Sequence, residues 1–217
     1  MKTYKNVVDI INEKDVFIFD FDGVVADSVS IKSKAFAELY SSYDIDIVNK
    51  IVDYHIENGG VSRFDKIKYY QKNIIGQNIT DKELKFLANK FSKLVFDKIV
   101  DCPSIEGVED FLEYYCTGRK KCYINTATPL EEIIRILKER EQIYFFSGIY
   151  GYPKSKSENL RCIADQYSVA SMVFFGDADT DLDASDNVGV DFIEVGDGHV
   201  VRKRKDCYHV HNFNNLC

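Results

Sequence analysis

The chain has 217 residues and a net charge of −7, and 45% of its residues are hydrophobic and 29% charged. That length is enough for one substantial core, or for a core domain with a smaller insertion. The acidic balance argues against a nucleic-acid partner, and no apolar run is long enough to span a bilayer. We therefore expect a soluble protein that is a monomer or a small homo-oligomer, without a membrane partner.

Six cysteines are spread along the chain, and no two have the C-x-x-C spacing of a zinc or redox site. No secretory leader is evident. We therefore expect reduced thiols and a cytoplasmic protein. A basic run at residues 202–205 departs from the acidic balance, and we interpret it as a solvated turn.

The first predicted element is a strand at residues 16–19, whose β-branched and aromatic residues suit a strand buried on both faces. A helix is predicted next, with Asp27 and Ser28 as candidate caps. Residues 30–103 contain no comparable strand and show helical periodicity, with a capping signal at residues 80–83. The sequence therefore predicts an all-helical segment inserted after the first strand.

Beyond this segment, strands and helices alternate. Strands are predicted at residues 122–124, 145–146, 172–175 and 191–195, with a weak edge strand within 208–213, and helices at 108–115, 131–140 and 157–166. This alternation indicates a parallel sheet covered on both faces. The predicted fold is α/β: a Rossmann-like parallel-sheet core of residues 1–29 and 104–217, with an inserted all-helical cap domain at residues 30–103.

Polar residues follow four of the predicted strands, at the edge where parallel sheets bind ligands. Asp20 and Asp22 follow the first strand, and an Asn-Thr-Ala-Thr-Pro run at residues 125–129 follows the second. A Lys-Ser-Lys run at 154–156 and a Gly-Asp-Ala-Asp-Thr-Asp run at 176–181 come after the next two. If the predicted sheet is right, all four segments meet in space.

These four segments resemble, in order, the four motifs of the haloacid dehalogenase-like (HAD) hydrolase superfamily. The matching residues are DFDGVVADS, INTATP, YGYPKSK and GDADTD. The resemblance covers nearly the whole chain. The helical insertion is similar to the α-helical cap of the branch that contains phosphoglycolate phosphatase and β-phosphoglucomutase. The resemblance implies a hydrolase whose partner is a small-molecule phosphate ester.

The resemblance also implies roles for the first motif. Side chains two residues apart point the same way along an extended chain, so Asp20 and Asp22 would flank one reaction centre. Asp20 would be the nucleophile that forms an aspartyl phosphate, and Asp22 the general acid and then the general base. Gly23 would let the chain turn sharply beside the phosphate.

Carboxylates gathered this closely repel one another, by roughly 4 kcal/mol per pair at about 4 Å. An oxygen-only site of this kind suits Mg²⁺ as the cofactor. By resemblance the metal would be held by the side chains of Asp20 and Asp177 and by the main-chain carbonyl of Asp22. Asp181 would bind it directly or through a water molecule.

The second and third motifs would hold the phosphoryl group. By resemblance Thr126 would donate its hydroxyl, and Ala127 its backbone amide, to a phosphoryl oxygen. A lysine would neutralise the transition-state charge. Lys156 fits the family's pattern at the start of a helix better than Lys154 does, and both stay candidates.

Within the insertion, residues 59–63 read Gly-Gly-Val-Ser-Arg. This segment resembles the cap loop of β-phosphoglucomutases, so Arg63 is a candidate to bind an anionic part of the substrate. Lys66 lies one turn further on the same face. The alternative interpretation is a plain helix start, with Ser62 as the cap and Arg63 in solvent.

Three branches of the family compete. Asp22 counts against a dehalogenase, which lacks the second aspartate. Val24 and the Arg63 loop favour a phosphosugar mutase, but Lys32 stands where mutases have a histidine, and lysine does not relay protons in the same way at neutral pH. We therefore predict a Mg²⁺-dependent phosphomonoester hydrolase acting on a small phosphorylated metabolite such as a sugar phosphate. The alternatives are a mutase of the β-phosphoglucomutase type and a non-catalytic binding module.

Overall fold

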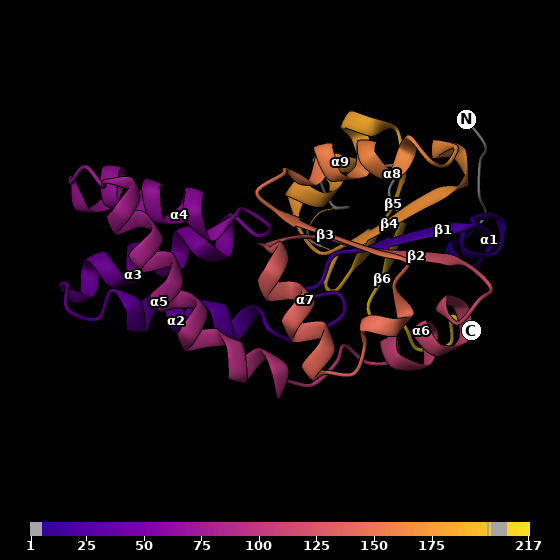
Figure 1. Ribbon diagram of the computed structural model, residues 1–217, viewed down its shortest axis with the longest axis horizontal. Helices are drawn as coiled ribbons and strands as arrows, with labels where there is room; N and C mark the ends of the chain where they lie inside the picture. Colours follow the sequence, from indigo (N-terminus) through magenta and orange to yellow (C-terminus); the bar gives the residue numbers. More distant parts are fainter. Residues whose placement is uncertain (1–5, 199, 201–207) are drawn as a thin grey trace.

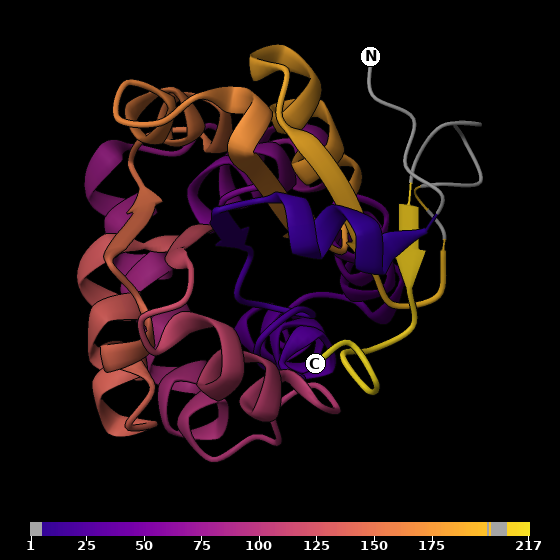
Figure 2. The same ribbon diagram turned by 90° about the vertical axis from the view of Figure 1, so that its right-hand side faces the viewer.

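The computed structural model describes residues 6–198, 200 and 208–217, so the basic run at 202–205 lies outside the described residues. Six parallel strands form one sheet in the order β3-β2-β1-β4-β5-β6. The strands are β1 (Val16–Phe19), β2 (Lys121–Pro129), β3 (Gly148–Tyr152), β4 (Met172–Gly176), β5 (Asp191–Val195) and β6 (Tyr208–Val210). The predicted parallel α/β fold is confirmed, and Figure 2 shows the yellow C-terminal strand β6 at the edge of the sheet.

Helices cover both faces of this sheet (Figure 1). They are α1 (Val7–Glu13), α6 (Val108–Cys116), α7 (Leu130–Glu139), α8 (Lys156–Ala164) and α9 (Asp179–Val188), with short 3₁₀ turns η2 (Ile143–Phe145) and η3 (Val169–Ser171). The alternation of side chains along β1 explains the two layers. Phe17 belongs to the core cluster that contains Phe111 of α6, whereas Val16 belongs to the cluster that contains Leu160 of α8.

The remaining helices lie together beside the sheet, as Figure 1 shows, and form the predicted helical cap. They are α2 (Val29–Leu39), α3 (Ile45–Glu57), α4 (Arg63–Tyr69), the π-helical turn η1 (Tyr70–Ile75) and α5 (Asp81–Val100). The predicted capping signal is confirmed, because Thr80 and Glu83 exchange side-chain and backbone hydrogen bonds at the start of α5. No helix among the described residues is long and apolar enough to cross a membrane.

Two chain segments connect the cap to the core, and they run side by side. The Asp27 amide donates to the Pro103 carbonyl at 2.9 Å, and Ala26 forms an antiparallel bridge with Ser104. Pairing of these two segments fixes where α2 leaves the core and where α5 returns to it. The exact cap bounds, residues 30–103, stay a prediction.

The predicted strand at residues 145–146 is wrong. Residue 145 ends the turn η2, and the strand beside β2 is β3, which begins at Gly148. Glycine weakens strands, so Gly148 and Gly151 conceal β3 in the sequence pattern. Close packing explains both glycines, since a Cβ on either would lie 3.0 Å or less from neighbouring atoms, in the case of Gly148 from the Tyr123 ring.

The expectation that all cysteines are reduced is wrong for two of them. Cys116 and Cys122 form a disulfide, with their Cα atoms 5.6 Å apart. Helix α6 ends at Cys116 and β2 begins at Lys121, so the short turn between them brings the two sulfurs together. A spacing of six residues gave no recognisable signal. Among the described residues the other cysteines, which are Cys102, Cys162 and Cys217, are free.

Candidate active site

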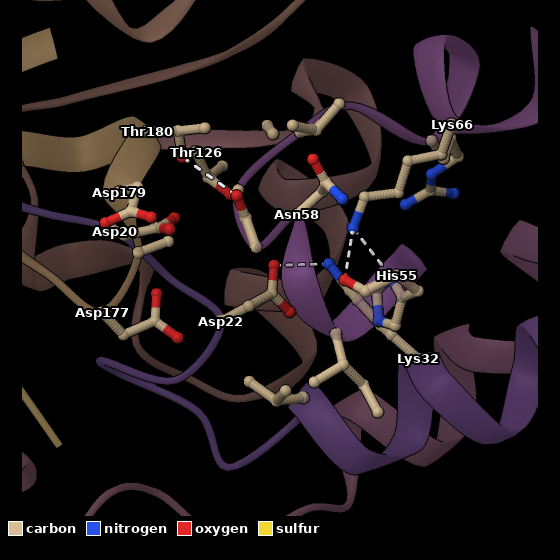
Figure 3. Close-up of a pocket in the computed structure, with 18 of the residues that line it drawn as sticks. Asp20, Asp22, Lys32, His55, Asn58, Lys66, Thr126, Asp177, Asp179 and Thr180 are labelled. Atoms are coloured by element: carbon tan, nitrogen blue, oxygen red, sulfur yellow. Dashed lines mark hydrogen bonds and ion pairs between the residues drawn. The ribbon is translucent and has the colours of Figure 1, made fainter. Parts of the chain in front are cut away.

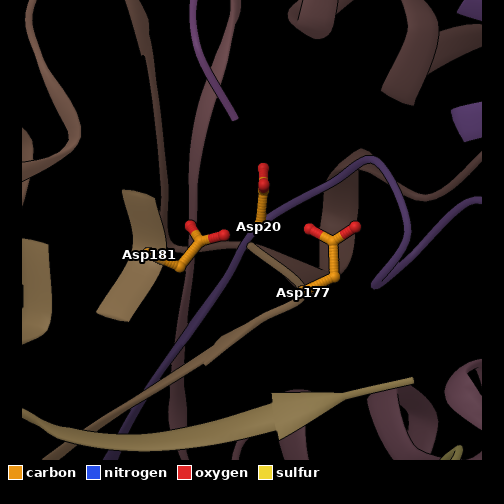
Figure 4. Close-up of side chains that lie close together, drawn as sticks. All are labelled: Asp20, Asp177 and Asp181. Atoms are coloured by element: carbon orange, nitrogen blue, oxygen red, sulfur yellow. The ribbon is translucent and has the colours of Figure 1, made fainter. Parts of the chain in front are cut away.

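Three carboxylates meet where neighbouring strands end. Asp20 directly follows β1, Asp177 directly follows β4, and Asp181 lies in the first turn of α9. Strands β1 and β4 are parallel neighbours, so their carboxyl ends lie at the same edge of the sheet. One oxygen from each carboxylate lies within 4.8 Å of the other two, and Figure 4 shows the three groups facing a common space.

The electrostatics of this cluster favour a bound cation. Burial, reinforced by the charges of Asp20 and Asp181, raises the pKa of Asp177 well above its ordinary value. Burial also raises the pKa of Asp181 to about 7, against the opposing effect of Lys156. Within the described part of the chain, no hydrogen-bond donor or cation contacts the Asp177 carboxylate. The site therefore offers three carboxylate oxygens as ligands, and the Asp177 carboxylate has no other partner among the described residues. This set of oxygen ligands fits Mg²⁺.

Lys156 joins two of these carboxylates. Its Nζ atom donates to Asp20 Oδ2 and to Asp181 Oδ1, each at 2.6 Å, and the residue is buried. Burial alone would lower the pKa of Lys156, but the attraction of Asp181 and Asp20 outweighs it and the pKa is raised. Lys154 is exposed, and its amine contacts Cys162 Sγ at 3.3 Å instead. Of the two candidate lysines, the fold brings only Lys156 to the cluster.

Asn125 fixes the position of Lys156, a role that the sequence analysis missed. Its Nδ2 donates to the Lys156 carbonyl at 3.0 Å, and its Oδ1 accepts from Asn159 Nδ2 at 3.0 Å. Both asparagines are buried. These bonds tie the end of β2 to the first turn of α8. The available signal was a polar residue directly after the apolar residues of the predicted strand and directly before Thr126.

The Asp22 carboxylate makes contacts outside the three-carboxylate cluster. Its Oδ1 accepts from Ser28 Oγ at 2.6 Å, and its Oδ2 accepts from Thr128 Oγ1 at 3.2 Å and from the Lys32 ammonium. Burial would raise the pKa of Asp22, but Lys32 and the three hydrogen bonds lower it below its ordinary value. Ser28 was expected to cap α2, and it occupies that position, but its hydroxyl binds Asp22 instead.

The chain turns tightly after Asp22. Gly23 has a φ of +78°, and a Cβ there would lie 2.2 Å from Asp177 Oδ2, so only glycine fits. Thr126 and Ala127 come at the end of β2 and line a cavity beside the cluster. Thr126 is buried, and its hydroxyl accepts from the Thr128 amide at 3.3 Å.

The cavity has a volume of about 780 Å³ and is lined by both the core and the cap (Figure 3). The cap loop lies directly against the core, because Thr180 Oγ1 donates to the Gly59 carbonyl at 3.2 Å. A Cβ on Gly60 would lie 1.9 Å from Thr180 Oγ1 and 3.0 Å from Lys156 Nζ. The cap therefore closes over the candidate nucleophile in this conformation.

Arg63 lies on the cap side of the cavity and is buried. Its two terminal nitrogens donate to the two carboxylate oxygens of Glu132 in α7, at 2.8 and 2.5 Å, and one also donates to Ser92 at 2.6 Å. Ser62 does cap α4, as the plain interpretation expects, but Arg63 is not in solvent. Substrate binding by Arg63 stays a prediction, and any ligand would compete with Glu132.

Lys66 is also buried on the cavity wall. Its Nζ contacts His55 Nδ1 at 2.7 Å and donates to the His55 carbonyl at 3.1 Å, as the dashed lines of Figure 3 show. Burial, followed by the charge of Lys32, lowers the pKa of Lys66 to about 7. Burial and the charge of Lys66 lower the pKa of His55 to about 3. The pair therefore combines an amine and a neutral imidazole, both of them buried.

Solved structures share this fold over almost their whole length. A β-phosphoglucomutase from Clostridium difficile has a TM-score of 0.77 at 20% identity, covering 94% of this chain and 93% of that chain. A protein described as a predicted phosphoglycolate phosphatase from Haemophilus somnus has a TM-score of 0.73 at 14% identity, covering 94% and 96%. CbbY from Rhodobacter sphaeroides, in complex with phosphate, has a TM-score of 0.71 at 14% identity, covering 94% and 96%. At these identities the likeness shows the fold alone.

A search of curated proteins found no match. The sequence pattern of a protein family, described as haloacid dehalogenase-like hydrolase, matches residues 17–195. This match spans most of the chain and includes all four predicted motifs. The chain belongs to the haloacid dehalogenase-like hydrolase family.

Proposed function

We propose that the protein is a Mg²⁺-dependent phosphomonoester hydrolase that acts on a small phosphorylated metabolite through an aspartyl-phosphate intermediate. The observation that supports this most strongly is the meeting of Asp20, Asp177 and Asp181 around one space, with Lys156 bound to two of them. A phosphoryl group needs a nucleophile and compensating positive charge, and this arrangement offers both.

Asp20 is the proposed nucleophile. Its Oδ1 accepts from the Phe21 amide at 2.6 Å and its Oδ2 from Lys156, so both oxygens are held in place. A carboxylate oxygen forms a bond to phosphorus while the bond from phosphorus to the leaving oxygen breaks. Thr126 and the Ala127 amide hold the phosphoryl oxygens. Mg²⁺ held by Asp20, Asp177, Asp181 and the Asp22 carbonyl would compensate the phosphate charge.

Asp22 is the proposed acid and base. It gives a proton to the leaving oxygen in the first step and takes a proton from the attacking water in the second. The hydrogen bonds from Ser28, Lys32 and Thr128 favour the carboxylate form, which the second step requires. Attack by water and attack by a sugar hydroxyl both need this base, so we favour a phosphatase over a mutase on a different ground: Lys32 stands where mutases have a histidine, and lysine does not relay protons in the same way at neutral pH.

The cavity beside the cluster takes the rest of the substrate. Arg63 and Lys66 are the proposed cap residues that contact it. CbbY from Rhodobacter sphaeroides has been solved with phosphate and, as a mutant, with xylulose-1,5-bisphosphate. A HAD-hydrolase from Bacillus subtilis of the same fold has been solved bound to magnesium. By analogy, a small organic phosphate and Mg²⁺ suit this site.

Phosphate release tests the proposal. Purified protein with Mg²⁺ is incubated with an aryl phosphate and a panel of sugar phosphates and hydroxy-acid phosphates. We expect inorganic phosphate to appear and Asp20→Asn to stop its release. A phosphosugar isomer in place of free phosphate would instead identify a mutase. No turnover of any ester would refute an enzymatic role and favour the binding module.

A further inference from the structure

The cap side of the cavity has three cationic side chains, and two of them already form an ion pair with a carboxylate. Lys32 is paired with Asp22, and Arg63 with Glu132. The third is Lys66, and no carboxylate of the described residues lies within 4.0 Å of its Nζ. The balance of charge around this half of the cavity therefore leaves one cation without a counter-ion.

Burial makes this imbalance unfavourable. The Lys66 side chain is only 2% exposed, and within the described part of the chain its amine forms hydrogen bonds only with the His55 ring and carbonyl. A buried charge without a partner is costly, and such groups in proteins are usually paired. Glu57, from the same helix as His55, also lines the cavity, but it is exposed and forms no ion pair with Lys66. Since none of the residues that the structure describes supplies the missing negative charge, we assign that charge to a ligand.

We propose that Lys66, held by His55, forms a subsite for a singly charged oxyanion on the substrate's leaving group, such as a carboxylate. The inference rests on the proposed function, because it assigns the far end of the same substrate. Figure 3 shows Lys66 and His55 on the side of the cavity away from Asp20 and Asp177. A ligand that bridges the two sides thus has a phosphate at one end and an acid at the other.

The number of free donors favours a carboxylate over a second phosphate. An ammonium group has three N–H bonds, and two of those of Lys66 are used by His55. One remaining donor matches one carboxylate oxygen. The fork-shaped guanidinium that suits a phosphate belongs to Arg63, and Glu132 occupies both of its terminal nitrogens. The resemblance to mutase cap loops indicates Arg63 as the residue that binds the far end of the substrate, whereas the contacts in the structure favour Lys66 for this role.

Binding to a catalytically inactive protein tests this directly. In an Asp20→Asn background with Mg²⁺, calorimetry compares 4-carboxyphenyl phosphate with 4-carbamoylphenyl phosphate, which has the same shape without the charge. We expect the carboxylate ester to bind about 10-fold more tightly or better, the effect of one charge-assisted hydrogen bond. Lys66→Met should remove this preference, and Lys66→Arg should keep part of it. Lys68→Met is the matched control, because Lys68 is exposed on the same helix.

Several outcomes would overturn the subsite. They are equal binding of the two esters, no binding of the carboxylate ester, and an unchanged preference after Lys66→Met. A bisphosphate, 1,4-phenylene bisphosphate, that binds more tightly than the carboxylate ester and loses this advantage with Arg63→Met would assign the subsite to Arg63. The unsubstituted Asp20→Asn protein gives the first comparison even if Lys66→Met does not fold. Failure of phosphate release by the native enzyme, with the binding preference intact, would refute the hydrolase and leave the subsite standing.

Discussion

Lys156 Nζ lies 2.6 Å from Asp20 Oδ2, although the two residues are 136 positions apart in the chain. The contact depends on two strand ends and on the start of α8, which the capping box of Ser155 and Glu158 fixes. Because Lys156 also binds Asp181, one ammonium orders two carboxylates of the cluster. The candidate nucleophile is therefore held in place before any ligand binds.

Lys156→Met should lower kcat/KM for any phosphate ester by roughly 100-fold or more, because it removes a charge that stabilises the transition state. Initial rates of phosphate release measure this. Lys154→Met is the control, since Lys154 is exposed and its amine contacts Cys162. Comparable losses in the two variants would contradict the assignment of Lys156.

Asn125→Val should lower kcat about 10-fold, because the variant frees the start of α8 and loosens Lys156. In a Lys156→Met background the same substitution should have little further effect, since both changes act through one group. Tyr123→Phe serves as the control, because it removes a buried-strand hydrogen bond, to Tyr167, without touching Lys156. Additive losses in the double variant would show that Asn125 acts independently of Lys156 and would contradict this positioning role.

The stability of Lys66→Met relative to the native chain should depend on pH. The pKa of Lys66 is lowered from 10.5 to about 7, so the unfolded chain binds more protons than the folded one between these values. The free energy of unfolding of the native chain therefore rises with pH in this window, by about 3 to 5 kcal/mol from this group. Lys66→Met removes that dependence, so its relative stability should be greatest below pH 7 and should decline toward pH 10.

Urea unfolding of both proteins at pH 6, 8 and 10 measures this difference, and the other titrating groups cancel in the comparison. Lys68→Met should show no such trend, because Lys68 is exposed. A stability difference that stays constant with pH would mean that folding does not lower the pKa of Lys66.

Gly60→Ala should reduce kcat/KM roughly 10-fold or more, because a Cβ would lie 1.9 Å from Thr180 Oγ1 and push the cap loop away from the nucleophile. Gly76→Ala is a closely matched control. Gly60 and Gly76 have φ values of +70° and +77°, so both substitutions strain the backbone by about 1 kcal/mol or more, yet nothing lies within 4 Å of a Cβ at Gly76. Similar activity in the two variants would refute the contact between the loop and the site.

Much of the fold was predictable, because its signals are local. The apolar strand at residues 16–19, the capping box at Thr80 and the alternation of later strands and helices all appear in the sequence pattern. The motifs also placed Asp20, Asp177 and Lys156 at one edge of the sheet, since parallel strands align their carboxyl ends. Strand β3 was not predicted because glycine has a low strand propensity. Its glycines are there because neighbouring atoms, such as the Tyr123 ring, leave no room for a side chain.

The contacts between cap and core were not predictable in the same way. Glu132 pairs with Arg63 across 69 residues, and Lys32 binds Asp22 and Thr128 across a domain junction. Such pairs depend on how the cap packs against the core. Neither hydrophobic periodicity nor residue spacing in the sequence indicates that packing. The disulfide between Cys116 and Cys122 is a similar case, because it depends on the geometry of the turn that connects α6 to β2.

Metal dependence of phosphate release tests the central claim, which is that the cluster of Asp20, Asp177 and Asp181 binds a divalent cation in order to transfer phosphate. Protein freed of metal by a chelator is assayed with 4-nitrophenyl phosphate and then titrated with Mg²⁺. The account predicts that Mg²⁺ raises the rate by about 100-fold or more, and that Asp177→Asn requires far more Mg²⁺ to reach half of its own maximum. Full turnover in excess chelator, or an unchanged Mg²⁺ requirement in Asp177→Asn, would contradict it.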